Sequence, residues 1–188
     1  MKLSTLRVLA VSTILSVSAF AGTAAFAENP MVGGAAMSES KDIIDNAVNS
    51  ADHTTLVAAV QAAGLVETLK GAGPFTVLAP VNAAFDALPA GTVETLLKPE
   101  NKDQLVKILT CHVIPAKAMA ADITKMAMDD GGEHVVDTVG GCKLTLKAAD
   151  GKVTVTDENG NVANVTIADV VQSNGVIHVI DKVLLPKS

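Results

Sequence analysis

The sequence predicts one α+β domain built around a β-sheet of mostly antiparallel strands. Apolar residues recur at helical spacing from about residue 40 to 111, whereas from residue 135 onward they alternate as in strands. Asp150-Gly151 and Asn159-Gly160 are hairpin signals between the alternating runs. The final run, residues 174–186, is apolar on both faces, which predicts a central strand covered on both sides.

The first 27 residues have the pattern of a secretory signal peptide. Lys2 and Arg7 precede an apolar run over residues 8–20, and Ala25-Phe26-Ala27 supplies a small-x-small cleavage site. A membrane anchor is the alternative, but hydroxyl side chains dilute the run and no stop-transfer flank follows. We therefore expect a secreted protein, periplasmic or extracellular, with no stable membrane insertion after signal removal.

The remaining chain divides into two parts in this interpretation. Residues 28–37, which include Gly33 and Gly34, are expected to form a flexible leader. Residues 38–187 are long enough for one domain with its own core. Loss of Lys2 and Arg7 with the signal would take the net charge from −6 to −8, which disfavours nucleic acid and anionic lipid as partners.

The helical half contains four polar residues placed to begin helices and one glycine placed to end one. Gly64 follows an apolar stripe and is a predicted C-cap. A short buried strand is expected between Pro74 and Pro80, and it contains Phe75, whereas Phe85 should point inward from the next helix. The predicted N-caps are Ser40, Asp52, Asn82 and Thr92.

The second half is expected to form a meander of strands. Side chains alternate along a strand, so His178 shares a face of the last strand with Val176 and Ile180. A histidine in such an apolar run is expected to be an interior ring held by hydrogen bonds. The predicted strands are 135–139, 142–147, 153–156, 162–167 and 176–185.

The only two cysteines, Cys111 and Cys142, predict a disulfide in a chain bound for an oxidising compartment. Two buried free thiols are the alternative. Thiol catalysis by Cys111 and His112 is not expected, because neighbours in an extended segment point to opposite faces. The four histidines are scattered along the sequence, so neither a zinc site nor any other cofactor is expected.

Three ordered segments resemble the signatures of the fasciclin-like domain family. They are Gly73–Phe85, Leu109–Pro115 and Asn174–Asp181. The resemblance covers nearly the whole chain after residue 38. It implies a wedge of two β-sheets with helices packed around it. From their positions in the predicted elements, we expect His178, Asn82, Phe75 and Phe85 to be structural residues.

The resemblance also implies an adhesion or protein-interaction role rather than catalysis. Interaction residues proposed for animal members lie at a Tyr-His segment and an Asp-Ile pair. Here these map to Cys111-His112, where the Tyr is absent, and to Asp169-Val170, where Val replaces Ile. The predicted binding residues are therefore Asp169, Val170 and His112.

The expected function is that of a secreted, non-catalytic protein-interaction module in cell-surface or matrix adhesion. Its partner would be a protein or a surface component, and not nucleic acid. The alternative is a periplasmic carrier of a small apolar ligand, which the high content of Ala, Val and Leu permits.

Overall fold

A computed structural model describes residues 29–149 and 151–187 of the chain. The predicted signal peptide, residues 1–27, lies outside the described residues. Seven strands form one sheet in the order β4-β3-β9-β8-β7-β6-β5, and all neighbours are antiparallel except β3 and β9. This confirms the predicted α+β class. The strands are β3 (Phe75–Pro80), β4 (Val113–Ile114), β5 (Glu133–Asp137), β6 (Lys143–Ala149), β7 (Lys152–Thr156), β8 (Val162–Gln172) and β9 (Gly175–Ile180).

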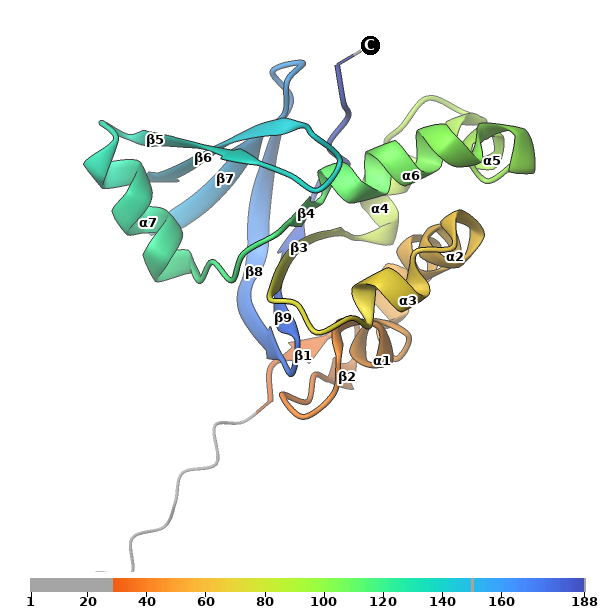
Figure 1. Cartoon of the computed structure of the whole chain (residues 1–188), viewed down its shortest axis with the longest axis horizontal. Helices are drawn as coiled ribbons and strands as arrows, with labels where there is room; N and C mark the ends of the chain where they lie inside the picture. Colours follow the sequence, from red (N-terminus) through yellow and green to blue (C-terminus); the bar gives the residue numbers. More distant parts are fainter. Residues whose placement is uncertain (1–28, 150, 188) are drawn as a thin grey trace, which may run out of the picture.

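Strand β8 bends the sheet into a wedge (Figure 1). Its first residues pair with β7, whereas the stretch from Val165 to Gln172 pairs with β9. The register shifts between Val165 and Ile167 and again between Ile167 and Val170. Such irregularities bend a strand and increase its twist. The β5–β7 side of the sheet therefore turns away from the β3–β9 side.

Strand β9 is central, as its sequence predicts. It lies between β3 and β8, with His178 opposite Leu78. Ile177 and Val179 pack on one side of the sheet into the larger cluster of buried apolar residues, the main core. Ile180 packs on the other side into a smaller cluster, the second core. The strand ends at Ile180 rather than at the predicted residue 185.

The helices cover the two sides of the wedge unequally. The first six lie together beside β3 and β9, whereas the seventh lies alone along β5 and β6 (Figure 1). The α-helices are α1 (Ile43–Ala47), α2 (Thr54–Ala63), α3 (Val66–Leu69), α4 (Asn82–Asp86), α5 (Thr92–Leu96), α6 (Lys102–Cys111) and α7 (Ala120–Asp129), and 3₁₀ turns span Ala51–His53 and Pro99–Asn101. Among the described residues, no helix combines the length and apolar character needed to cross a bilayer.

The predicted flexible leader is wrong for its described part. Residues 31–32 and 35–36 form the short strand pair β1 (Met31–Val32) and β2 (Ala35–Ala36). Val32 and Met37 are 3% and 2% exposed and belong to the main core. These two side chains therefore pack into the same core as the helices and the sheet.

Three of the predicted N-caps are also wrong. Helix α1 starts at Ile43, and the Asp42 carboxylate, not Ser40, accepts the capping hydrogen bond. Asp52 lies inside a 3₁₀ turn, and Thr92 is already the first residue of α5. Gly64 does end α2, with a left-handed φ of 74° that a residue without Cβ adopts easily.

Asn82 is structural, but it caps a different helix from the one expected. It is the first residue of α4, and its side chain reaches back to the start of α2. Its Oδ1 accepts from the Thr55 backbone N–H at 3.0 Å, and its Nδ2 donates to the Ala51 carbonyl at 2.8 Å. The residue satisfies a free N–H in the first turn of α2 and joins two helices.

Candidate functional site

Asp169, the first predicted binding residue, connects strands β8 and β9 to helix α7. Its backbone N–H donates to Nδ1 of His178 at 3.2 Å, and its Oδ1 accepts from the Ala120 N–H at 2.7 Å. Ala120 is the first residue of α7, so the carboxylate lies at the positive end of the helix dipole. Asp169 is partly exposed, and its φ is 58°. Asp tolerates this left-handed conformation better than most residues.

His178 completes this connection from inside the sheet. Its Nε2 donates to the Ala118 carbonyl at 2.8 Å while its Nδ1 accepts from Asp169, so the ring is neutral with its proton on Nε2. Burial lowers the pKa of His178, and the Ala118 carbonyl and Asp169 oppose that shift. The structure places this residue in the interior, as its apolar run predicts.

Val170 and His112, the other two predicted binding residues, do not lie on the surface. Val170 is 0% exposed in the main core, and His112 is 2% exposed. Contrary to expectation, the side chains of Val170 and His112 therefore do not face a partner. The register shift in β8 between Ile167 and Val170 turns the side chain of Val170 inward. The binding role itself stays a prediction.

His112 joins the end of α6 to the C-terminal segment. Its Nδ1 donates to the Ile108 carbonyl at 2.8 Å, and its Nε2 accepts from the Leu184 N–H at 2.9 Å. Burial lowers the pKa of His112 to about 4, opposed by the Ile108 carbonyl and Asp157. The neighbouring Cys111 is bonded to Cys142 with a Cα–Cα distance of 5.4 Å. The predicted disulfide is therefore confirmed, and it removes the thiol beside this imidazole.

The two aromatic residues expected to be structural lie in the main core region. Phe85 is 7% exposed within it, and Phe75 is partly buried against it. Neither forms an exposed aromatic platform.

A surface groove lies beside Asp169. It has a volume of about 460 Å³ and runs between the start of α7 and strands β7 and β8. Exposed polar and small side chains line it, so it is reachable by a macromolecular partner. They include Lys152, Asn164, Thr166 and Ala168.

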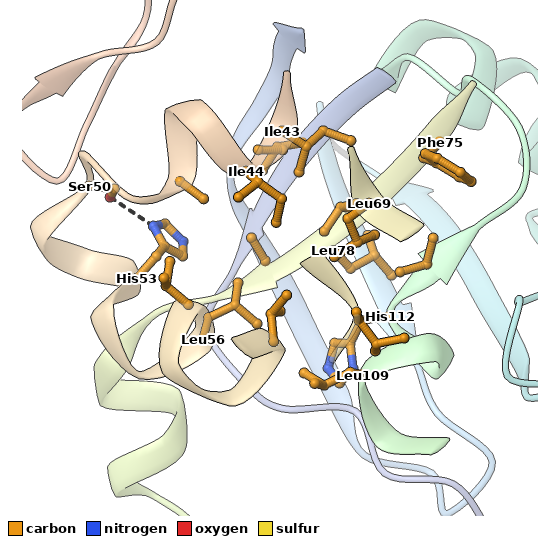
Figure 2. A pocket seen from close by; sticks show the side chains of 18 of the residues that line it. Ile43, Ile44, Ser50, His53, Leu56, Leu69, Phe75, Leu78, Leu109 and His112 are labelled. Atoms are coloured by element: carbon orange, nitrogen blue, oxygen red, sulfur yellow. Dashed lines mark hydrogen bonds between the residues drawn. The ribbon is translucent and has the colours of Figure 1, made fainter. Parts of the chain in front are cut away.

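An interior cavity of about 60 Å³ lies between helices α1–α3 and the sheet. Apolar side chains surround it, among them Ile44, Leu56 and Leu69, and the ring of His53 enters from one side (Figure 2). Nδ1 of His53 is hydrogen-bonded to Oγ of Ser50 at 2.8 Å. Nε2 is buried and has no hydrogen-bond partner. Burial lowers the pKa of His53, and the Ala79 carbonyl near the ring and the charge of Asp52 oppose the shift. That carbonyl does not meet hydrogen-bond geometry at Nε2, so the nitrogen is unpartnered.

Sequence reasoning did not single out His53 or Asn174 as individual residues of consequence. The Ser50-x-x-His53 spacing at a helix start is the signal that could have drawn attention to the former. In the sequence, Asn174 is only the first residue of the last signature segment, but its side chain bonds to α1 and to the end of α3. The described residues hold no group of three or more His, Cys, Asp or Glu side chains placed to bind a metal ion.

Comparison with known proteins gives a family match over most of the chain. The model of the Fasciclin domain matches residues 51–186. Protein sll1483 of Synechocystis sp. is 53% identical over 159 residues, covering 85% of this chain and 81% of that protein. Transforming growth factor-beta-induced protein ig-h3 of Sus scrofa is 39% identical over 136 residues, which are 70% of this chain but only 17% of that protein.

The fold is also similar to a solved structure. A FAS1 domain pair from the insect cell adhesion molecule fasciclin I matches with a TM-score of 0.69 and 18% sequence identity. The match covers 77% of this chain and 51% of that one. At this identity the likeness shows the fold alone.

Proposed function

Since this chain belongs to the Fasciclin domain family, we propose that it is a secreted, non-catalytic protein-interaction module that acts in adhesion at the cell surface or in the matrix. The observation that carries the proposal is the family match over residues 51–186. One protein of similar fold is named as an insect cell adhesion molecule. Secretion rests on the predicted signal peptide and is supported by the buried disulfide.

The chemistry of the interior supports binding rather than catalysis. His112 and His178 each use both ring nitrogens in hydrogen bonds that hold backbone segments together. Burial lowers the pKa of both rings, so both are uncharged at neutral pH and the proton that each ring keeps is held in a hydrogen bond to a backbone carbonyl. An imidazole in this state positions the fold and offers no free base to a substrate.

We place the partner-binding surface at the groove beside Asp169. Asp169 is the one predicted binding residue whose side chain is partly exposed. Lys152 and Thr166 are exposed along the same groove and offer polar contacts next to small side chains. Interfaces of this kind combine a packed centre with a polar rim.

Attachment of protein-coated beads to intact cells of the source organism tests this proposal. Thr166→Arg places a long charged side chain in the groove and should reduce attachment at least fivefold. Thr95→Arg is the matched control, because Thr95 is exposed on helix α5, outside the groove. Equal attachment by both variants would show that the groove is not the binding surface.

A second measurement tests the adhesion role itself. The unmodified protein should retain a defined partner from the native envelope fraction, and excess soluble protein should compete for that partner. If neither attachment nor competable retention is observed, the adhesion proposal is wrong, whichever surface is considered.

A further inference from the structure

The interior cavity contains a polar atom that the fold leaves without a partner. His53 is 3% exposed, and its Nε2 has no hydrogen-bond partner, whereas all four ring nitrogens of His112 and His178 are bonded. An unpartnered buried polar group destabilises a protein by about 1–3 kcal/mol. Figure 2 shows this nitrogen on the side of the ring that faces the surrounding apolar side chains.

A single water molecule fits this site poorly. Buried waters form about three hydrogen bonds to polar groups of the protein. Apart from His53, the polar side chains of the lining are those of Ser50, Thr68, Thr110 and His112. The hydroxyl groups of Ser50 and Thr110 already bond to His53 Nδ1 and to the Val106 carbonyl, both ring nitrogens of His112 are bonded, and Thr68 is exposed at the surface. Water bonded to Nε2 would therefore face mainly apolar atoms.

We propose that this cavity binds a small neutral alcohol, whose alkyl part contacts the apolar side chains and whose hydroxyl group hydrogen-bonds to Nε2 of His53. A hydroxyl group suits the site whichever ring nitrogen holds the proton. If Ser50 donates to Nδ1, Nε2–H donates to the hydroxyl oxygen. If Nδ1–H donates to Ser50, Nε2 accepts from the hydroxyl hydrogen.

The charge and size of the ligand follow from the lining. No Asp, Glu, Lys or Arg lies among the described residues that surround the cavity, so a charged group would be buried without a partner. The volume of about 60 Å³ is roughly four to six times the 10–15 Å³ that a cavity needs to hold one water molecule. The ligand, or the part of it that enters, therefore has only a few non-hydrogen atoms. This site is independent of the surface groove proposed for adhesion.

Binding can be measured by NMR titration with propan-1-ol and with 1-chloropropane, in which chlorine replaces the hydroxyl group. The informative variant is Ser50→Ala/His53→Phe, which removes both hydrogen-bonding side chains and keeps a ring in place. The affinity ratio of alcohol to chloroalkane should be roughly tenfold higher for the unmodified protein than for the variant. An equal ratio in the two proteins would overturn the proposal.

The unmodified protein alone provides a second readout, which does not depend on folding of that variant. Saturating propan-1-ol should shift the ¹⁵N resonance of His53 Nε2 and leave those of His178, which does not line the cavity, unchanged. Absence of saturable binding, or a cavity density that refines as water in the presence of the alcohol, would also overturn the proposal.

A pair of matched substitutions locates the binding. Val60→Ile adds a methylene group to the cavity lining, whereas Val153→Ile adds one to the second core, beyond the sheet. The first should weaken propan-1-ol binding at least threefold, and the second should leave it unchanged. Equal effects of the two would place the bound alcohol elsewhere.

Discussion

The carboxylate of Asp169, on strand β8, accepts a 2.7 Å hydrogen bond from the backbone N–H of Ala120, the first residue of helix α7. These residues are 49 positions apart in the sequence. The contact attaches α7 to the bend of β8, and the backbone of Asp169 is bonded in turn to His178. The residue that family resemblance assigns to binding therefore also has a structural role.

Replacement of Asp169 should consequently affect stability before it affects adhesion. Asp169→Ala removes the acceptor for the Ala120 N–H. It also places alanine, which has no polar side chain to stabilise a left-handed backbone, at a φ of 58°. We expect the free energy of unfolding to fall by about 2–3 kcal/mol, measured by urea denaturation. Asp169→Gly should cost less than Ala, because it removes only the cap. Equal stabilities of the Ala variant and the unmodified protein would contradict this account.

Asp169→Asn separates the structural role from the binding role. Asn keeps an acceptor for the Ala120 N–H and tolerates a positive φ, but it removes the negative charge. Stability should change by less than about 1 kcal/mol. If bead attachment nevertheless falls severalfold, the charge of Asp169 takes part in binding. Unchanged attachment would confine Asp169 to the structure.

Acid should destabilise the protein through its buried histidines. The pKa of His112 is about 4 in the folded state and 6.5 in the unfolded chain, so between these values only the unfolded state gains the proton. The contribution of His112 is complete above pH 6.5 and is lost as the pH falls toward 4. We expect a loss of about 2 kcal/mol between pH 6.5 and pH 5. Burial shifts His178 and His53 in the same direction.

Two measurements check this pH dependence. Urea unfolding at pH 7.5, 6 and 5 gives the change in stability above the range where most carboxylates titrate. NMR titration of the His112 ring gives its folded pKa directly. A midpoint near 6.5 for His112 would show that the ring is not buried as described.

The disulfide should contribute a large share of the stability. It links residues 31 positions apart, and a loop of this length corresponds to about 3–4 kcal/mol in the loop-entropy model. Cys111→Ala/Cys142→Ala should lose at least this amount in urea denaturation. Reduced but otherwise unmodified protein is the matched control, because it keeps both sulfur atoms. A thiol titration of the unfolded, unreduced protein should find no reactive sulfur.

Asn174 should be among the least replaceable polar residues. Its Oδ1 accepts from the Ile43 N–H at 3.1 Å, and its Nδ2 donates to the carbonyls of Leu69 and Gly71 at 2.8 and 2.9 Å. Asn174→Ala leaves these three backbone groups unpaired, and we expect a loss of about 3 kcal/mol or more.

Asn101→Ala is the matched control for that substitution. Asn101 also donates to a carbonyl, that of Thr95, at 2.8 Å, but this hydrogen bond is exposed to solvent. Water can replace the exposed bond, so the loss should stay below about 1 kcal/mol. Similar losses for the two variants would show that the Asn174 bonds are not the reason for its effect.

Features that depend on local periodicity or on counting could be predicted from the order of the amino acids. Alternation of apolar residues predicted the central position of the strand that contains His178, because only a strand covered on both faces is apolar on both faces. Two cysteines allow only one disulfide. Gly64 ends α2 because the helix is closed by a residue in the left-handed conformation. This requirement is local and does not depend on tertiary contacts.

The pairing of polar groups could not be predicted in this way, because it depends on the three-dimensional arrangement of the chain. Asn82 caps α2 rather than its own helix, and Asp169 caps α7, because hydrogen-bond partners depend on how elements distant in sequence are placed. The same holds for Val32, which completes a core assembled from later elements. The lack of a partner for Nε2 of His53 could not be predicted from the sequence. It depends on the positions of all the side chains around the ring, which come from distant parts of the chain.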